Sequence, residues 1–331
     1  MLVPSVAFAD AMGQVTVALS PQGMAAATAL GETPQQLSDQ IQSQVNAEYQ
    51  ANNVSQFLRQ FTDATGFSNR GLGVDYVSAP HSFMIGFAGA ASVASSDVLT
   101  GTQHPTGGLA ANFGVMIGTN LKGWDLPRWT LFANGWYESG STDKLTGHLS
   151  SGGAHLQYRL VQPEQDGGSA IVLRWIGIDV TSGIEYTRWT LGVNDSITNN
   201  FTIGSGQQAQ TVSLASTGKF DLTSQTLTVP IEITTGFRII ELVSVYFGGG
   251  VDLTVGKTTV DGDLNGTMTT SDGTNLGTVH ITESGSNTGS PAALRGLAGV
   301  QLNLWKLKIF VQGNVSQIPA ASVSFGLRLV L

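Results

Sequence analysis

The chain has 331 residues and a formal net charge of −8, with 41% hydrophobic and only 11% charged residues. Soluble globular proteins usually carry about 25% charged residues, so this composition indicates contact with an apolar phase. The acidic balance argues against nucleic acid as a partner, because phosphate binding needs clustered lysine and arginine. The sequence has no cysteine, which excludes disulfides and cysteine-ligated metals and fits an extracytoplasmic protein.

Membrane contact has to be reconciled with the absence of a long apolar run. No window offers the roughly 18 to 20 uninterrupted apolar residues that a transmembrane helix needs. A closed β-barrel is one of the few other structures that can span a bilayer.

Residues 1–9 are interpreted as the end of a signal peptide. Ala7-Phe8-Ala9 has the small-x-small form of a cleavage site before Asp10, although the basic stretch that opens a signal peptide is missing. We therefore expect the mature protein to be exported.

Residues 10–80 are expected to form a mainly helical segment. TPQQ at residues 33–36 reads as a helix start, with Thr as N-cap, Pro at the first helical position and Gln three residues after the cap. Leu37, Ile41 and Val45 follow at i+4 spacing, opposite a face rich in Gln, Asn and Ser. Such a face can enter a polar cavity without burying many charges. A lumen plug, a periplasmic cap and a coiled interaction segment all fit this pattern.

From about residue 81 the pattern changes to alternation with a period of two, which is typical of β-strands. In LTVPIEITTGFR, residues 227–238, the apolar side chains at 227, 229, 231, 233 and 237 face one way. Similar rows of about 9 to 11 residues recur, the length of a tilted strand that crosses a bilayer. In a β-sandwich these rows would face a core, whereas in a membrane barrel they face lipid. Their regular length favours the barrel.

The sequence predicts an all-β fold, a transmembrane antiparallel up-and-down β-barrel of about ten strands over residues 81–331. Residues 170–194 keep one parity throughout, which favours a single long strand over a hairpin. Twelve strands would result if residues 10–20 and 71–77 also paired. The polar segments 195–225 and 257–291 are expected to be long outer loops, and they are candidates for binding an extracellular ligand.

The C-terminal strand VSFGLRLVL, the signal-like N-terminus and the repeated amphipathic strands together resemble the Gram-negative outer-membrane β-barrel class. That class usually ends on Phe or Trp, whereas Leu331 ends this chain. The resemblance implies an outer-membrane location, contact with outer-membrane lipid and lipopolysaccharide, and recognition by the barrel-assembly machinery through the C-terminal strand. The segment ahead of the strands also resembles that of fatty-acid-transporter barrels, in which the N-terminus plugs the lumen.

The polar residues that alternate with the apolar rows point to the other side of each strand, and they are the candidate lumen-lining residues. They either bind a solute or pair with one another to close the lumen. The predicted lumen-lining residues are Asp179, Glu185, Glu232, Arg238, Asp252, Arg295, Gln301, Lys308 and Arg328.

His148 and Ser150 form a weaker catalytic candidate. Two residues apart on one strand, they emerge on one face, with the parity of the lipid side. This resembles the His-x-Ser of outer-membrane phospholipase and lipid A deacylase barrels, in which Ser150 would be the nucleophile and His148 the base. The residue that follows, Ser151, departs from the Asn of those families.

Three functions remain open from the sequence. The first is a porin-like passive channel or transporter for small or hydrophobic solutes, or alternatively an anchor for surface loops. The second is an outer-membrane acyl hydrolase that uses Ser150, and the third is a secreted soluble β-sandwich adhesin. No metal site or cofactor is predicted, since the five histidines lack metal-ligand spacing and no glycine-rich phosphate loop occurs.

Overall fold

The computed structural model describes residues 12–50, 54–78, 83–95, 107–163, 172–204 and 209–331. The expected signal peptide at residues 1–9 therefore lies outside the described residues. The helices of the described part are α1 (Pro21–Ala29), α2 (Pro34–Gln50), α3 (Val54–Phe67) and a short 3-10 helix, η1 (Leu121–Trp124). Its strands are β1 (Met12–Leu19), β2 (Phe83–Ala94), β3 (Gly108–Asn120), β4 (Trp129–Ser141), β5 (Leu145–Val161), β6 (Leu173–Ile203), β7 (Gln210–Ile239), β8 (Val243–Thr270), β9 (Asn275–Thr288), β10 (Ala292–Leu304), β11 (Leu307–Ser316) and β12 (Ala320–Val330).

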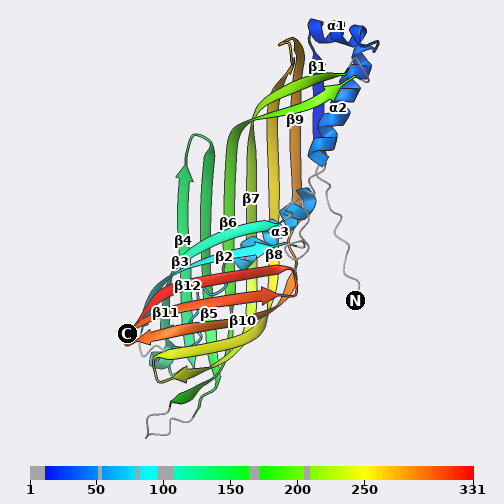
Figure 1. The fold of residues 1–331 in the computed structure, drawn as a ribbon. Coiled ribbons are helices and arrows are strands. Elements are labelled where there is room, and N and C mark those ends of the chain that lie inside the picture. Colours follow the sequence, from blue (N-terminus) through cyan, green and yellow to red (C-terminus); the bar gives the residue numbers. More distant parts are fainter. Residues whose placement is uncertain (1–11, 51–53, 79–82, 96–106, 164–171, 205–208) are drawn as a thin grey trace, which may run out of the picture.

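Ten of these strands close into an antiparallel ring in the order β2-β3-β4-β5-β6-β7-β8-β10-β11-β12 (Figure 1). The last strand closes on the first, with a register that runs from Ala320↔Ala94 to Val330↔Met84. The predicted ten-stranded barrel is confirmed, and residues 170–194 contribute to one long strand, β6. Residues 71–77 form no strand, while β1 pairs with β9 outside the ring.

The two faces of the ring differ sharply in polarity. Ile231, Ile233 and Val311 face outward and are 46%, 56% and 52% exposed, whereas Glu232 and Arg328 face inward and are 3% and 1% exposed. A sandwich would place these residues the other way round, so the soluble β-sandwich alternative is wrong. The closed ring with an apolar outer surface confirms a transmembrane β-barrel. None of the helices that the structure describes has the length and apolar character needed to span a bilayer.

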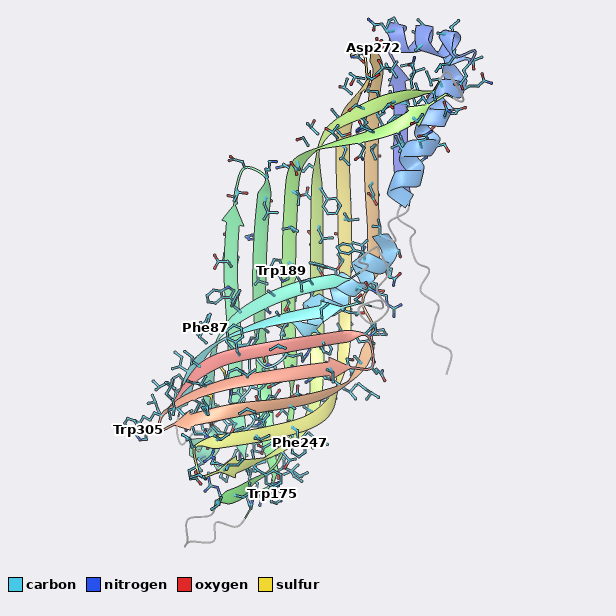
Figure 2. The ribbon with its side chains drawn as sticks, viewed as in Figure 1. Phe87, Trp175, Trp189, Phe247, Asp272 and Trp305 are labelled. Atoms are coloured by element: carbon cyan, nitrogen blue, oxygen red, sulfur yellow. The ribbon has the colours of Figure 1, made fainter. Side chains whose placement is uncertain are left out.

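The end of the ring that holds Phe83 and Leu331 is here called the inner end, and the opposite end the outer end. The backbones of these two residues exchange hydrogen bonds, with Leu331 N donating to Phe83 O at 2.8 Å. Figure 2 shows Trp175 and Trp305 at the inner end, far from Asp272.

Strands β4 to β8 continue beyond the outer end of the ring as a curved sheet, to which β9 and β1 are added (Figure 1). This part is called the extension. The segments 195–225 and 257–291, expected as loops, mostly form the extended parts of β6 to β9. The expectation of long loops is corrected here, because cross-strand pairing continues: β6 and β7 pair as far as Ile203↔Gln210.

The tip of the extension carries a hydrophobic core of its own, separate from the barrel. Helix α2 begins with the predicted cap, since Gln36 N donates to Thr33 Oγ1 at 3.2 Å and Thr33 N donates to Gln36 Oε1 at 2.8 Å. Its apolar side chains pack onto the concave face of the sheet. The buried core residues are Val15, Ala27, Leu37, Ile41, Val45, Ile203, Val212, Leu214, Met268, Leu276, Val279 and Ile281. We call β1, α1, α2 and the strand tips that they cover the distal module.

Candidate functional site

Helix α3 lies in the outer mouth of the ring, against strands from several sides. Ser92 Oγ of β2 donates to Ala64 O at 2.6 Å. On the other side, Asp63 accepts hydrogen bonds from Ser290 N at 2.6 Å and from Ser290 Oγ at 3.0 Å, and Asn287 Nδ2 donates to Ser55 O at 2.8 Å. The helix is therefore bound to both β2 and the β9–β10 connection.

The C-terminal half of α3 is buried on every side, which requires its polar side chains to find partners. Thr62 Oγ1 donates to Leu58 O at 2.9 Å, and Thr65 Oγ1 donates to Phe61 O at 2.8 Å. These bonds return to the preceding turn of the same helix. The apolar side of α3 packs on Leu222 and Val260 of the extended sheet. A helix with this composition can fill the mouth of the ring without leaving these hydroxyls unpaired.

From α3 the chain continues through the interior of the ring as the segment Ser68–Ser78, here called the lumen segment. All of its residues are buried. Asn69 Nδ2 donates to Thr187 Oγ1 at 2.5 Å near the outer end, and Ser78 Oγ accepts from Gln301 Nε2 at 2.9 Å further along the segment. Because β2 then starts at the inner end, the chain crosses the ring from one end to the other.

The lumen segment contributes one cation and one anion to the interior. Arg70 lies 2.9 Å from Glu185 and 3.4 Å from Asp252, so it joins β6 to β8. Asp75 lies 3.5 Å from Arg328 of β12, whose guanidinium also donates to Val74 O at 2.6 Å. Buried charges are tolerated when an opposite charge lies close by, as each of these has.

A second set of contacts connects the lumen segment to the wall through Glu232. Tyr76 Oη donates to Glu232 Oε2 at 2.6 Å, and its ring stacks on Tyr246 at a centroid distance of 5.6 Å. Arg295 pairs with Glu232 and, at 3.0 Å, with Asp252. Arg70 and Arg295 therefore share Asp252. Arg70 of the lumen segment and the wall residues Glu185, Asp252, Arg295 and Glu232 therefore form one continuous network of ion pairs.

The close approach of the lumen segment to the wall also depends on Gly71. Its φ is +83°, in the left-handed region, and a Cβ atom there would lie 2.2 Å from Ser324 Oγ. Any other residue would be strained and would collide with β12. The lumen segment thus fits the interior both in charge and in shape.

The structure brings most of the predicted lumen residues together. Asp179, Glu185, Glu232, Asp252, Arg295, Gln301 and Arg328 are all buried inside the ring. Arg238 and Lys308 lie apart from them at the inner rim, where Arg238 pairs with Glu241 at 3.1 Å and Lys308 Nζ donates to Trp305 O at 2.6 Å.

Sequence reasoning missed the partners that the lumen segment supplies. Arg70, Asp75 and Tyr76 were not selected, although two charges within the short, glycine-containing stretch SNRGLGVDYVS were a usable signal. Arg159 was missed as well, and this partly exposed side chain pairs with the buried Asp179 at 3.1 Å.

His148 and Ser150 lie on the outward face of β5. His148 Nε2 is 3.5 Å from Tyr137 Oη and its ring packs edge-on against the tyrosine at 5.3 Å. A cavity of about 340 Å³ opens beside the histidine, lined by Ser139, Gly140, Ser141, Thr146, Gly147, His148 and Thr190. Within the described residues no carboxylate orients the imidazole, and Ser150 does not line this cavity. Nor does any group of three or more His, Cys, Asp or Glu in the described part form a metal site.

A family model described as Lsa36-like matches residues 11–331, nearly the whole chain. The protein belongs to the Lsa36-like family. No curated protein matches this Lsa36-like chain.

Solved outer-membrane barrels resemble the Lsa36-like chain at low identity. The outer-membrane protease OmpT from Escherichia coli has 8% identity and a TM-score of 0.38, and the match covers 76% of this chain and 98% of OmpT. The translocator domain of the autotransporter NalP from Neisseria meningitidis has 10% identity and a TM-score of 0.33, with coverage of 87% and 97%. The toluene transporter TodX from Pseudomonas putida has 8% identity and a TM-score of 0.26, with coverage of 80% and 96%. These likenesses concern the fold and carry no activity to the Lsa36-like chain.

Proposed function

We propose that the protein is a plugged outer-membrane barrel that anchors the extension and presents the distal module outside the cell. Of the functions that the sequence left open, this develops the surface anchor rather than the channel. The observation that carries it is the pairing of Arg70 with Glu185 and Asp252, which holds the chain inside the ring.

The closed lumen supports an anchor over a passive channel. A ten-stranded ring has little free interior once side chains point inward. Here the lumen segment occupies that interior as well, and α3 lies in the outer mouth. A solute would have to displace paired charges whose exposure is 5% or less, such as Arg70, Glu185 and Arg295.

The dimensions of the extension support presentation at a distance from the membrane. The outward apolar row of β7 ends at Leu227. Between Gln225 and Gln210, where the strand begins, the outward-facing residues are polar apart from Ala215. Fifteen residue steps in a strand correspond to about 50 Å. The paired strands β6 to β9 form a stiff support of this length, which a flexible loop would not provide.

The topology supports an extracellular position for the distal module. In bacterial barrels the connections on the periplasmic side are short, and those on the outer side are long. The inner end carries tight turns such as Trp305–Lys306, while the long hairpins all project from the outer end. The N-terminal part of the chain then lies outside and reaches β2 only by passing through the ring.

Cysteine labelling tests this arrangement cleanly, because the chain has no cysteine of its own. Ser271→Cys at the tip of the extension and Met24→Cys in α1 place single thiols on exposed positions outside the ring. Lys306→Cys places a matched thiol in the exposed inner turn. On intact cells, a membrane-impermeant maleimide should label the first two and leave Lys306→Cys unlabelled until the outer membrane is permeabilised. Labelling of Lys306→Cys alone on intact cells would refute the proposed orientation.

A further inference from the structure

The outward apolar surface of the ring is here called the apolar belt. Its outer boundary is sharply defined on three neighbouring strands. Tyr186 of β6, Leu227 of β7 and Val255 of β8 are register partners and form the last apolar row that faces outward. They are 39%, 43% and 78% exposed. The polar outer surface of the extension begins with the next outward-facing row. The membrane surface must therefore lie between these two rows on this side of the barrel.

That next row carries two cations at one level. Arg188 of β6 pairs in register with Gln225 of β7, which pairs with Lys257 of β8. The three residues are exposed. Two strand spacings separate the cations, which is about 10 Å. Ser150 of β5 continues the row beside Arg188.

The charge pattern around this row leaves the two cations without protein partners. In the described part of the chain, the side chains of Arg188 and Lys257 have no hydrogen-bond or ion-pair partner, although both residues take part in backbone pairing of the sheet. Other cations of the extension are paired, Lys144 with Asp195 at 2.7 Å and Lys219 with Asp221 at 2.6 Å. The two unpaired positive charges therefore stand where the belt meets water.

Hydroxyl groups surround the cations on the side away from the membrane. Thr190, Thr223 and Thr259 are register partners and form the outward row directly above Arg188 and Lys257. Threonine hydroxyls both donate and accept hydrogen bonds, as sugar hydroxyls do. Towards the inner end, the outward apolar side chains that begin with Tyr186, Leu227 and Val255 form a surface for acyl chains.

We infer that Arg188 and Lys257 bind the phosphates of a phosphorylated glycolipid of the outer leaflet. Arginine and lysine favour phosphate oxygens through charge-assisted hydrogen bonds. Cations next to an apolar surface at the membrane boundary attract anionic headgroups. The threonine row fits the sugar of such a lipid, and the apolar columns fit its acyl chains. A phosphoglyceride without a sugar would use the cations but not the threonines.

The test measures binding of purified bisphosphorylated lipid A to the full-length protein in detergent. The double variant Arg188→Gln with Lys257→Gln removes both proposed contacts, and Lys144→Gln with Lys219→Gln removes the same charge elsewhere in the extension. We expect the first double variant to bind about tenfold more weakly or worse, and the control to bind like the wild type. All three proteins should keep the heat-sensitive gel shift of a folded barrel, since every substituted side chain is exposed.

Binding measurements with other ligands identify which part of the glycolipid is recognised. Dephosphorylated lipid A and inorganic phosphate should both bind far more weakly than the intact glycolipid. Equal binding by the two double variants would overturn the assignment of the site. Phosphatidylglycerol binding as tightly as lipid A would overturn the glycolipid assignment. The assignment to the outer leaflet rests on the proposed orientation of the barrel. Binding in detergent can be measured whatever the orientation, so this test and the labelling test can fail separately.

Discussion

The guanidinium of Arg70 lies 2.9 Å from the carboxylate of Glu185, and both side chains are almost completely enclosed by the ring. Arg70 belongs to the lumen segment and Glu185 to the barrel wall. Through Asp252 the same guanidinium reaches β8 and, through that carboxylate, Arg295. The interior of this barrel is consequently a structural core of paired charged residues. Removing one of them leaves several others without a partner of opposite charge.

Replacing Arg70 with Met should therefore strongly destabilise the barrel. Methionine keeps much of the volume and removes the charge, so Glu185 and Asp252 each lose a buried partner. Breaking a buried ion pair in this way costs about 3–5 kcal/mol in the free energy of unfolding. Urea unfolding of the refolded protein in lipid vesicles measures it. Arg174→Met, which removes the exposed pair with Glu241, should cost less than about 1 kcal/mol. Equal effects of the two substitutions would rule out a tightly paired interior.

The position of the belt can be tested on one strand with one type of substitution. Ile231→Lys puts a charge on the outward face of β7 within the apolar row, and Ala215→Lys puts the same charge on the outward face of the extension. In a transmembrane barrel a lysine near the bilayer midplane costs about 2–4 kcal/mol, and much less outside the apolar region. Folding titrations into vesicles should show this difference. If Ala215→Lys were the more harmful change, the assigned position of the apolar belt along β7 would be wrong.

The distal module should depend on its own core rather than on the barrel. Ile41 of α2 is completely buried against the sheet, and Ile41→Ala leaves a cavity that costs about 2–5 kcal/mol. Amide hydrogen exchange should rise in β1 and α2 while the ring remains protected. Ser43→Ala, on the exposed side of the same helix, should leave exchange unchanged. Faster exchange throughout the ring in Ile41→Ala would show that the module and the barrel form a single cooperative unit.

Glu283 gives the extension a defined pH dependence. It lies on the same face of β9 as the core residues Val279 and Ile281, outside the membrane-spanning part, and partial burial raises its pKa above the usual value. A raised folded pKa means that the folded state binds the proton more tightly than the unfolded state. The stability of the extension should therefore increase as pH falls through that pKa. Glu283→Gln should stabilise the extension at neutral pH and flatten this dependence in hydrogen-exchange measurements. If the stability advantage of Glu283→Gln over the wild type grew as the pH fell, the assignment would be contradicted.

The ring was predictable because its strands alternate strictly in polarity. The row of Leu227, Val229, Ile231 and Ile233 could be read directly from the sequence, and its parity identified the lipid face. The single strand across residues 170–194 followed from the same parity rule. One pattern therefore specified the fold class, the strand number and the outward side chains.

The extension was not predictable from alternation, because its outward face is polar and its inner face mixes apolar residues such as Leu214 and Met268 with polar ones such as Ser216 and Thr270. Segments such as TNNFT at 198–202 and TVDGD at 259–263 have the composition of loops, and only pairing with neighbouring strands makes them extended. The lumen network was missed for a different reason. Arg70 and its partner Glu185 are far apart in the sequence, and only closure of the ring brings them together.

Electrical recording from the full-length protein in planar lipid bilayers tests the closed lumen most directly. The account predicts that insertion of the wild-type protein leaves the membrane seal intact, with no stable conductance steps, because α3 and the lumen segment fill the ring. Reproducible open steps at each insertion of wild-type protein would contradict it, since they would require an interior free of the paired charges of Arg70, Glu185 and Asp252.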